Sequence, residues 1–285
     1  MNMDFHTHGK LAKYLPFSTQ YADWLLGAAR SAGLDAICLT EHFNTRQFAD
    51  VYAYVAARGE RQGDACVFDG LKVFPGMETD IAEGGHVLCL GPMEAILELN
   101  RRLDGHKARG TFLPAAELFA LFAQYPLLVG AGHPFREGGH IPELPGEQLA
   151  RFDFIDLNGK DVAEDMQRAQ QRAYALGERL GIPVVAGSDT HQATQYGCIC
   201  TQFEREFCTF AALREELRSG RYAIRIHPEA RFKVETAALV KRALREVHAL
   251  GGDYASVLLQ TKGGSPAVQA AKERARLAAA SERGE

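Results

Sequence analysis

Short apolar runs alternate with longer stretches of helical spacing along most of this chain. The short runs predict strands at 3–5, 36–39, 71–75, 87–90, 127–130, 152–157, 182–186 and 198–203. The stretches between them are rich in strong helix formers and predict helices at 21–32, 45–62, 93–103, 115–124, 161–180 and 210–219. This alternation favours an α/β fold in which helical crossovers join the strands of a parallel sheet.

One region departs from the alternation of strands and helices. Residues 71–90 hold two strand patterns with no room for a helix between them. The segment Glu83-Gly84-Gly85 lies at their junction, and it predicts a hairpin or a sharp bend.

The character of the chain changes after about Arg231. Residues 234–250 have the pattern of an amphipathic helix, and the Ala/Arg/Glu-rich end at 267–285 predicts a peripheral helical tail. We therefore expect one barrel domain over residues 1–232 and a C-terminal helical extension over residues 233–285.

Histidines and acidic residues recur where the predicted strands end. In closed parallel α/β barrels, catalytic groups collect at this edge, whereas unrelated structural histidines would scatter between helices and strands. The segments concerned are Asp4-Phe5-His6-Thr7-His8, Thr40-Glu41-His42, Gly76-Met77-Glu78, Gly85-His86, Gly132-His133-Pro134 and Gly187-Ser188-Asp189-Thr190-His191.

These segments together supply a mixed nitrogen and oxygen ligand set for metal ions. Successive side chains of a strand alternate between faces, so His6 and His8 point the same way, as do Asp189 and His191. One divalent ion needs four to six donors, so eight donors imply two ions. Imidazole with carboxylate suits Zn, Mn or Fe better than Mg or Ca. The eight predicted ligands are His6, His8, His42, Glu78, His86, His133, Asp189 and His191.

Composition and charge narrow the function classes. The 285 residues are 46% hydrophobic and 24% charged, which excludes collagen-like and wholly disordered chains. The net charge of −4 gives no global basic field for nucleic acid, so nucleic acid is an unlikely partner. No apolar run is long enough to span a bilayer, and the N-terminus lacks the pattern of a signal peptide, so we expect a cytoplasmic protein with reduced cysteines and no membrane partner.

The motifs, in this order, resemble those of the PHP (polymerase and histidinol phosphatase) family of metal-dependent phosphoesterases. They span residues 4–191, about two thirds of the chain, and the C-terminal third adds no recognisable motif. The resemblance implies a distorted seven-stranded β/α barrel, similar to a TIM barrel, with two or three metal ions at the strand ends. It also implies an enzyme, a hydrolase that acts on phosphoric ester bonds.

The resemblance further implies how the ligands divide among the metal ions. His6, His8, Glu78 and Asp189 would hold the first ion, and Glu78 would bridge to a second ion held by His86 and His133. A third ion would use His42 and His191 with one ligand from the loop after His8. That loop, residues 9–18, contains no His, Asp or Glu, so we expect the third position to be weak or vacant.

The chemistry expected of such a centre is hydrolysis of a small phosphomonoester by a metal-bridging hydroxide. Asp189 belongs to the catalytic set, and His191 or His42 would protonate the leaving alkoxide if the third ion is missing. The residues expected to bind the substrate are Arg136, Lys10, Lys160 and Asn158. Histidinol phosphate and nucleotide phosphates are both compatible with the family.

Three other functions stay open from the sequence. A phosphodiesterase or exonuclease of the same family would differ only in the openness of its cleft. An amidohydrolase-type C–N hydrolase often uses a carboxylated lysine as the bridging ligand, whereas Glu78 occupies that position here. A non-catalytic, metal-stabilised module would bind metal without turnover. The sequence also leaves open a homo-oligomer, the metal identity and the physiological substrate.

Overall fold

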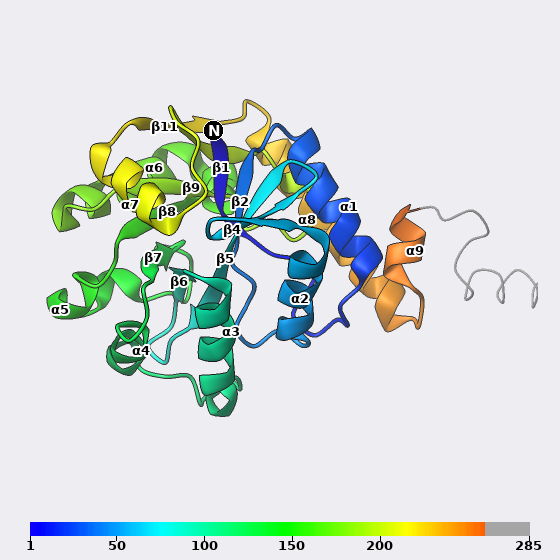
Figure 1. Ribbon diagram of the computed structural model, residues 1–285, viewed down its shortest axis with the longest axis horizontal. Coiled ribbons are helices and arrows are strands. Elements are labelled where there is room, and N and C mark those ends of the chain that lie inside the picture. Colours follow the sequence, from blue (N-terminus) through cyan, green and yellow to red (C-terminus); the bar gives the residue numbers. More distant parts are fainter. Residues whose placement is uncertain (260–285) are drawn as a thin grey trace, which may run out of the picture. The chain divides into compact units, whose positions relative to one another are not determined.

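The structure, a computed structural model, describes residues 1–259, and all of the strands in that range belong to a first unit, Met1–Thr236 (Figure 1). The central strands are buried on both faces, which agrees with their nearly continuous apolar sequences. The strands are β1 (Asn2–Thr7), β2 (Ala36–Leu39), β3 (Glu60–Gln62), β4 (Ala65–Phe68), β5 (Leu71–Asp80), β6 (His86–Leu90), β7 (Leu128–Gly132), β8 (Phe154–Asn158), β9 (Val184–Gly187), β10 (Ile199–Phe203) and β11 (Tyr222–Ile226).

The strands form a nearly closed sheet. Its hydrogen-bonded path is β11-β10-β1-β2-β5-β6-β7-β8-β9, and β3 and β4 form a hairpin that pairs with β5. An isolated parallel bridge between Thr7 and Thr190 joins the end of β1 to the segment after β9. The prediction of an α/β, barrel-like fold is confirmed. The seven strands of the predicted barrel are not, because the path has nine strands and β1 meets β9 only at this bridge.

Helices lie around the strands of the first unit (Figure 1). Side chains at their ends explain several of the boundaries: Ser18 accepts a hydrogen bond from the backbone N–H of Tyr21 before α1, and Gly181, at φ 66°, ends α6. The helices are α1 (Thr19–Ser31), α2 (Phe48–Arg58), α3 (Met93–Arg102), α4 (Ala115–Phe122), α5 (Gly146–Leu149), α6 (Gly159–Leu180), α7 (Phe210–Ser219), α8 (Ala230–Ala249) and α9 (Tyr254–Leu259).

Two connections differ from the simple alternation of strands and helices. The hairpin predicted around residues 83–85 is confirmed, because β5 and β6 pair antiparallel on either side of it. The connection from β6 to β7 contains two helices, α3 and α4, and β7 runs antiparallel to β6. The sheet is therefore mixed, not wholly parallel.

The predicted helix at 45–62 is wrong in its last turn. Helix α2 ends at Arg58, because Gly59 has an extended backbone with ψ 155°. Residues 60–62 form β3, and Gly63 turns the chain back into β4 with a φ of 62°. The sequence Glu-Arg-Gln of β3 has good helix formers, so pairing with β4 outweighs local propensity here.

Strand β1 shows how the fold separates apolar core from polar site. Met3 and Phe5 belong to the apolar core, where the Phe5 ring meets Phe154 edge-on at 5.6 Å. Asp4 and His6 point to the opposite face of the same strand and are also fully buried. One strand therefore carries both the packing side chains and the first site residue.

A second unit begins at Ala237 within α8 and includes α9. In it, Gly251, at φ 80°, follows α8, and the rings of His248 and Tyr254 lie 6.3 Å apart. The boundary of the C-terminal extension at residue 233 stays a prediction, and the predicted helix at 267–285 lies outside the described residues. Among residues 1–259, no helix has the length and apolar character needed to cross a membrane.

Candidate metal centre

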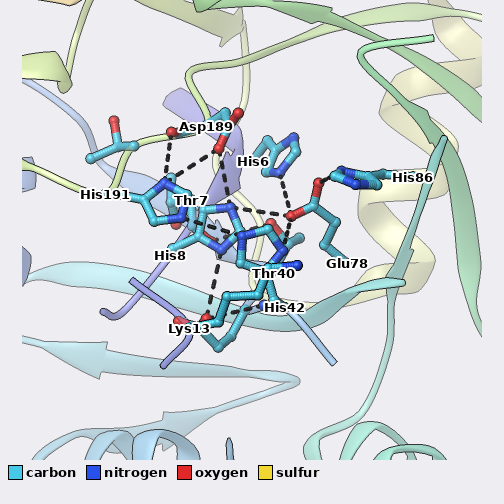
Figure 2. Close-up of polar contacts among 12 residues, drawn as sticks. His6, Thr7, His8, Lys13, Thr40, His42, Glu78, His86, Asp189 and His191 are labelled. Atoms are coloured by element: carbon cyan, nitrogen blue, oxygen red, sulfur yellow. Dashed lines mark hydrogen bonds and ion pairs between the residues drawn. The ribbon is translucent and has the colours of Figure 1, made fainter. Parts of the chain in front are cut away.

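The strand ends bring the eight predicted ligands into one cluster, and Figure 2 labels all of them except His133, which contacts Glu78. Backbone hydrogen bonds fix the segments that carry them. The N–H of Asp189 donates to the carbonyl of His6 at 2.7 Å, and the N–H of His8 donates to Thr190 at 2.9 Å. The N–H of Phe43, next to His42, donates to the carbonyl of Glu78 at 2.8 Å.

Glu78 lies at the middle of the cluster, and its two oxygens face different histidines. Its Oε2 is 3.5 Å from Nε2 of His6, 3.4 Å from Nε2 of His8 and 2.7 Å from Nδ1 of His42. Its Oε1 is 3.1 Å from Nε2 of His133 and accepts a hydrogen bond from Nδ1 of His86. The carboxylate therefore separates the imidazoles into two sets.

Asp189 connects the other end of the cluster to nearby cations. Its Oδ1 is 3.2 Å from Nε2 of His8 and 3.4 Å from Nδ1 of His191. Its Oδ2 is 2.8 Å from the Arg136 guanidinium and 2.7 Å from Nζ of Lys160. Asp189 thus faces ligands with one oxygen and cations with the other.

Several buried atoms of the cluster lack a hydrogen bond, and this is what a metal site requires. Within the described residues, Nε2 of His6, both ring nitrogens of His8 and Oε2 of Glu78 are buried without a hydrogen-bond partner. Leaving such atoms unsatisfied costs free energy, whereas a metal ion bound to their lone pairs would satisfy them. Three groups of donors lie close enough to share an ion: His6, His8 and Asp189; His6, Glu78 and His133; and His8, His42 and His191.

The electrostatics of the cluster favour charged carboxylates and two neutral imidazoles, those of His42 and His133. Burial alone would raise the pKa of Glu78, but the imidazoles around it, His42 first, hold its pKa well below the ordinary value. Burial, with Arg136 adding to it, lowers the pKa of His133 to about 4. Burial also lowers the pKa of His42. His86 differs: burial lowers its pKa, but the carboxylate of Glu78 outweighs burial and raises this pKa to about 9. Neutral imidazole and ionised carboxylate are the forms that bind metal ions.

Backbone strain is concentrated in the same place. His133 and Asp189 have φ values of 28° and 57°, in the left-handed region that non-glycine residues seldom adopt. Gly187, just before Asp189, allows a close approach, because a Cβ there would lie 2.5 Å from that of His6. The chain holds both ligand candidates in conformations that ordinary turns avoid.

Two acidic residues that the sequence analysis did not select support the histidines. Oδ2 of Asp156 accepts from Nδ1 of His6 at 2.9 Å, and Oδ1 of Asp80 is 3.0 Å from Nε2 of His86. Such contacts fix the orientation of an imidazole ligand. The alternation of strand faces would have found both, because Asp80 lies two residues after Glu78, and Asp156 two residues before Asn158.

Three of the four predicted substrate-binding residues lie beside the centre. Arg136 donates to Oδ1 of Asn158 at 2.8 Å as well as to Asp189, and Lys160 contacts Asp189. Lys10 is different: it is buried, and its Nζ donates to the backbone carbonyls of Lys13 and Arg46. Lys10 holds its own loop together, and we leave it out of the proposed phosphate site.

Two cavities border the centre on different sides. The first, of about 460 Å³, is lined by Arg136, Asn158, Lys160 and residues of α6, and we call it the α6 cavity. The second, of about 650 Å³, is lined by Lys13, Tyr14, Asn44, Arg46, Asp80, Arg109 and Phe112, and we call it the loop cavity. Figure 2 shows Asp189 and Lys13 on opposite sides of the imidazoles. The α6 cavity reaches the ligands through Asp156, which contacts His6, and through Arg136 and Lys160, which contact Asp189. The loop cavity reaches them through Asp80, which contacts His86.

The third predicted metal position has two histidines facing one another. Nε2 of His42 and Nε2 of His191 are 3.3 Å apart. The loop after His8 brings no acidic side chain or histidine to them, since residues 9–18 contain none. Occupancy of this position stays a prediction.

Comparison with protein families gives a match in the second half of the barrel. Residues 167–222, which include Asp189 and His191, match the sequence model of the PHP-associated family. The resemblance to the PHP family is confirmed. The match covers a part of the chain, and the other motifs of the PHP resemblance lie before it. No match was found among the curated proteins.

Solved structures with the same fold include two kinds of protein. PsfC from Pseudomonas syringae PB-5123 is similar over 85% of this chain and 98% of its own, at 23% identity and a TM-score of 0.69. The lesion-specific endonuclease PfuEndoQ from Pyrococcus furiosus is similar over 78% of this chain and 57% of its own, at 17% identity and a TM-score of 0.55. An Endonuclease Q complex with a duplex substrate gives 18% identity and a TM-score of 0.57, covering 79% and 58% of the two chains. At these identities the likeness concerns the fold.

Proposed function

We propose that this protein is a metal-dependent phosphoesterase that hydrolyses a small phosphomonoester. The observation that carries the proposal is the division of contacts at Glu78. One of its oxygens faces His6 and His8, and the other faces His86 and His133. A carboxylate in this arrangement suits a bridge between two ions, and paired ions are characteristic of enzymes that cleave phosphate esters.

The contacts of Glu78 support the ligand assignment that the PHP resemblance implies, in which this carboxylate bridges two ions. When bound, two divalent ions supply Lewis acidity toward the phosphoryl oxygens and lower the pKa of water. Zn, Mn and Fe fit imidazole and carboxylate best. By that assignment, the residues that would hold the ions are His6, His8, Glu78 and Asp189 for the first, Glu78, His86 and His133 for the second, and His42 and His191 for a third. The close groups of donors overlap at two residues, because His6 also lies with Glu78 and His133, and His8 also lies with His42 and His191.

The chain's own cations bind and orient the phosphate. Arg136 and Lys160 project to the edge of the centre at Asp189, where their N–H groups donate to the phosphoryl oxygens. Asn158 holds the Arg136 guanidinium through its Oδ1. If the third ion is absent, the facing Nε2 atoms of His42 and His191, 3.3 Å apart, can share one proton and supply it to the leaving oxygen.

The test is a panel of matched aryl substrates with protein loaded separately with Mn²⁺, Zn²⁺ or Fe²⁺. We expect release of phosphate from p-nitrophenyl phosphate, loss of turnover on chelation, and recovery when the metal returns. The corresponding anilide and carboxylate ester should be poor substrates. Metal binding without turnover of any phosphoester would contradict the proposal and favour a non-catalytic module.

A second candidate is hydrolysis of a phosphodiester in a nucleic acid. The two cavities leave space on both sides of the centre, and a diester has substituents on both sides of its phosphorus. The likeness to an Endonuclease Q in complex with a duplex counts against the expectation that nucleic acid is an unlikely partner. Faster turnover of bis-p-nitrophenyl phosphate than of the monoester would favour this candidate.

A further inference from the structure

The loop cavity carries cations that the proposed reaction does not use. Lys13, Arg46 and Arg109 line it, together with the aromatic rings of Tyr14 and Phe112. Its one acidic lining residue is Asp80. Three cations therefore share about 650 Å³ with a single carboxylate.

Both oxygens of the Asp80 carboxylate already contact side chains of the protein. Its Oδ1 contacts Nε2 of His86 at 3.0 Å, and its Oδ2 is 3.6 Å from Nζ of Lys13. Asp80 also connects the cavity to the centre, because His86 contacts Glu78. A group bound near Lys13 would thus lie one side chain away from the ligands.

The two arginines have no acidic partner. Within residues 1–259, the guanidinium groups of Arg46 and Arg109 make no hydrogen bond or ion pair with a carboxylate, and both residues are exposed. Cations held near one another repel, and an anion between them removes that repulsion. Planar guanidinium groups bind phosphate and carboxylate oxygens through paired N–H donors.

Hydrogen bonds between loops fix the backbone of the segments that carry Lys13 and Arg46. The N–H of Arg46 donates to the carbonyl of Lys13 at 2.8 Å, and Lys10 donates to the carbonyls of both residues. Nδ2 of Asn44 is 3.4 Å from Oδ2 of Asp80 and 3.4 Å from the carbonyl of Lys107. The loop after β1 and the loop after β2 are therefore joined, so the anion does not have to order them.

We propose that the loop cavity binds a second anionic group of the substrate, on the alcohol part of the ester. This inference rests on the proposed function. Arg46, Arg109 and Lys13 hold the second anion, and the rings of Tyr14 and Phe112 cover the carbon skeleton that joins it to the reacting phosphate. The substrate class is a phosphoester whose alcohol carries a phosphate or a carboxylate.

Hydrolysis of matched esters tests the preference. Three substrates share a three-carbon alcohol and differ in the group at its far end. This group is a neutral hydroxyl in propane-1,3-diol monophosphate, a phosphate in propane-1,3-diol bisphosphate and a carboxylate in 3-phosphooxypropanoate. We expect kcat/KM to be at least about 10-fold higher for the two substrates that carry a second anion, because a hydrogen bond to a charged group contributes enough free energy for a factor of that size. In R46A and R109A the ratio between anionic and neutral-ended substrates should fall about 10-fold each. R61A is the matched control, because Arg61 pairs with Glu94 and lines neither cavity.

Binding of unreactive analogues separates this inference from the proposed function. Metal-loaded protein is titrated with propane-1,3-bisphosphonate and with propylphosphonate. Tighter binding of the bisphosphonate that is lost in R46A and R109A, without hydrolysis of any ester, would keep the anion site and remove the proposed reaction. Turnover of the monophosphate, with no advantage for the second anion in rate or binding, would keep the reaction and overturn this inference. Thermal unfolding of both variants confirms that they fold.

Discussion

The two cavities beside the metal centre have similar numbers of cations but different pairing of charge. In the α6 cavity, Arg136 is bound by Asp161 at 3.2 Å and by Asp189 at 2.8 Å, and Lys160 also contacts Asp189. Two further cations line it, Arg168 and Arg172, and Arg172 lies 4.4 Å over the ring of Phe135. In the loop cavity, Lys13 is the only one of the three described cations that contacts an acidic group.

From this difference in charge pairing we infer different roles for the two cavities. A guanidinium already held by carboxylates is oriented by them, so Arg136 is a positioned donor at the reacting phosphate. An exposed guanidinium without a carboxylate, such as Arg46, adds attraction for an anion that approaches from solvent. We therefore assign the reacting phosphate to the α6 side and the second anion to the loop side.

The largest effect on activity is expected for a substitution of Glu78, which lies between the two sets of imidazoles. Glu78→Gln removes the negative charge that both sets of imidazoles face, so the metal content and kcat should fall together. We expect kcat to fall by at least about 100-fold, because loss of a metal ligand should have a larger effect than loss of a group that is hydrogen-bonded to a ligand. Elemental analysis and kinetics with mono- and dianionic substrates measure this. The loss should be equal for all substrates, and Glu117→Gln, on the exposed face of α4, is the control. Near-parental activity with full metal content would refute the bridge.

Asp156→Asn should weaken metal binding on the α6 side. The substitution removes the charge that accepts from Nδ1 of His6, and such losses reduce metal affinity about 10- to 100-fold. Excess metal should restore most of kcat, which a general packing defect would not allow. Calorimetric titration of chelated protein with Mn²⁺ measures the affinity, and an unchanged affinity would show that Asp156 does not tune the ligand.

Arg136→Ala sharpens the comparison between the cavities directly. It should raise KM about 10-fold for every phosphoester, with or without a second anion, because it removes a charged donor from the reacting phosphate. Arg136→Lys should recover part of the loss, since it restores the charge without the fork of donors. If KM rose only for substrates with a second anion, the assignment of the two sides would have to be reversed.

The smallest kinetic effect is expected for Lys10→Met. The change should alter KM less than 2-fold, roughly the resolution of the assay, and lower the free energy of unfolding by about 1–3 kcal/mol because two carbonyls lose their donor. Burial lowers the pKa of Lys10 to about 8, so the folded protein releases this proton before the unfolded chain does. Parental stability should therefore rise relative to the variant from about pH 8 to pH 10, as denaturant unfolding would show. A large rise in KM would show that Lys10 binds the substrate.

Sequence alone located the cluster because strand ends are easy to recognise. Seven of the eight ligand candidates follow or end a short apolar run, and His86 begins one, in a strand that runs antiparallel to β5. The pairs His6/His8 and Asp189/His191 have the spacing of one strand face. Residues so placed meet wherever the sheet closes, whatever the lengths of the helices between them. The same argument predicted the α/β barrel-like fold but not the count of strands in its path.

The loops and the supporting acids were harder to predict. Arg46 follows β2, whereas Arg109 and Phe112 lie between α3 and α4, and only tertiary structure brings these connections to one cavity. Strand β3 was missed because Glu60–Gln62 has helical propensity and pairs only through β4. Asp156 and Asp80 lie two residues from Asn158 and Glu78, so strand alternation places them on the same face as these site residues. A single acidic residue on a strand is common, however, and spacing alone does not identify it as part of a site.

Anomalous diffraction from crystals grown with Mn²⁺ tests the central claim most directly. The claim is that the side chains around Glu78 hold at least two metal ions. We expect one anomalous peak beside His86 and His133 and another beside His6, His8 and Asp189, with the carboxylate of Glu78 between them. A single peak away from Glu78, or none at saturating metal, would contradict the account.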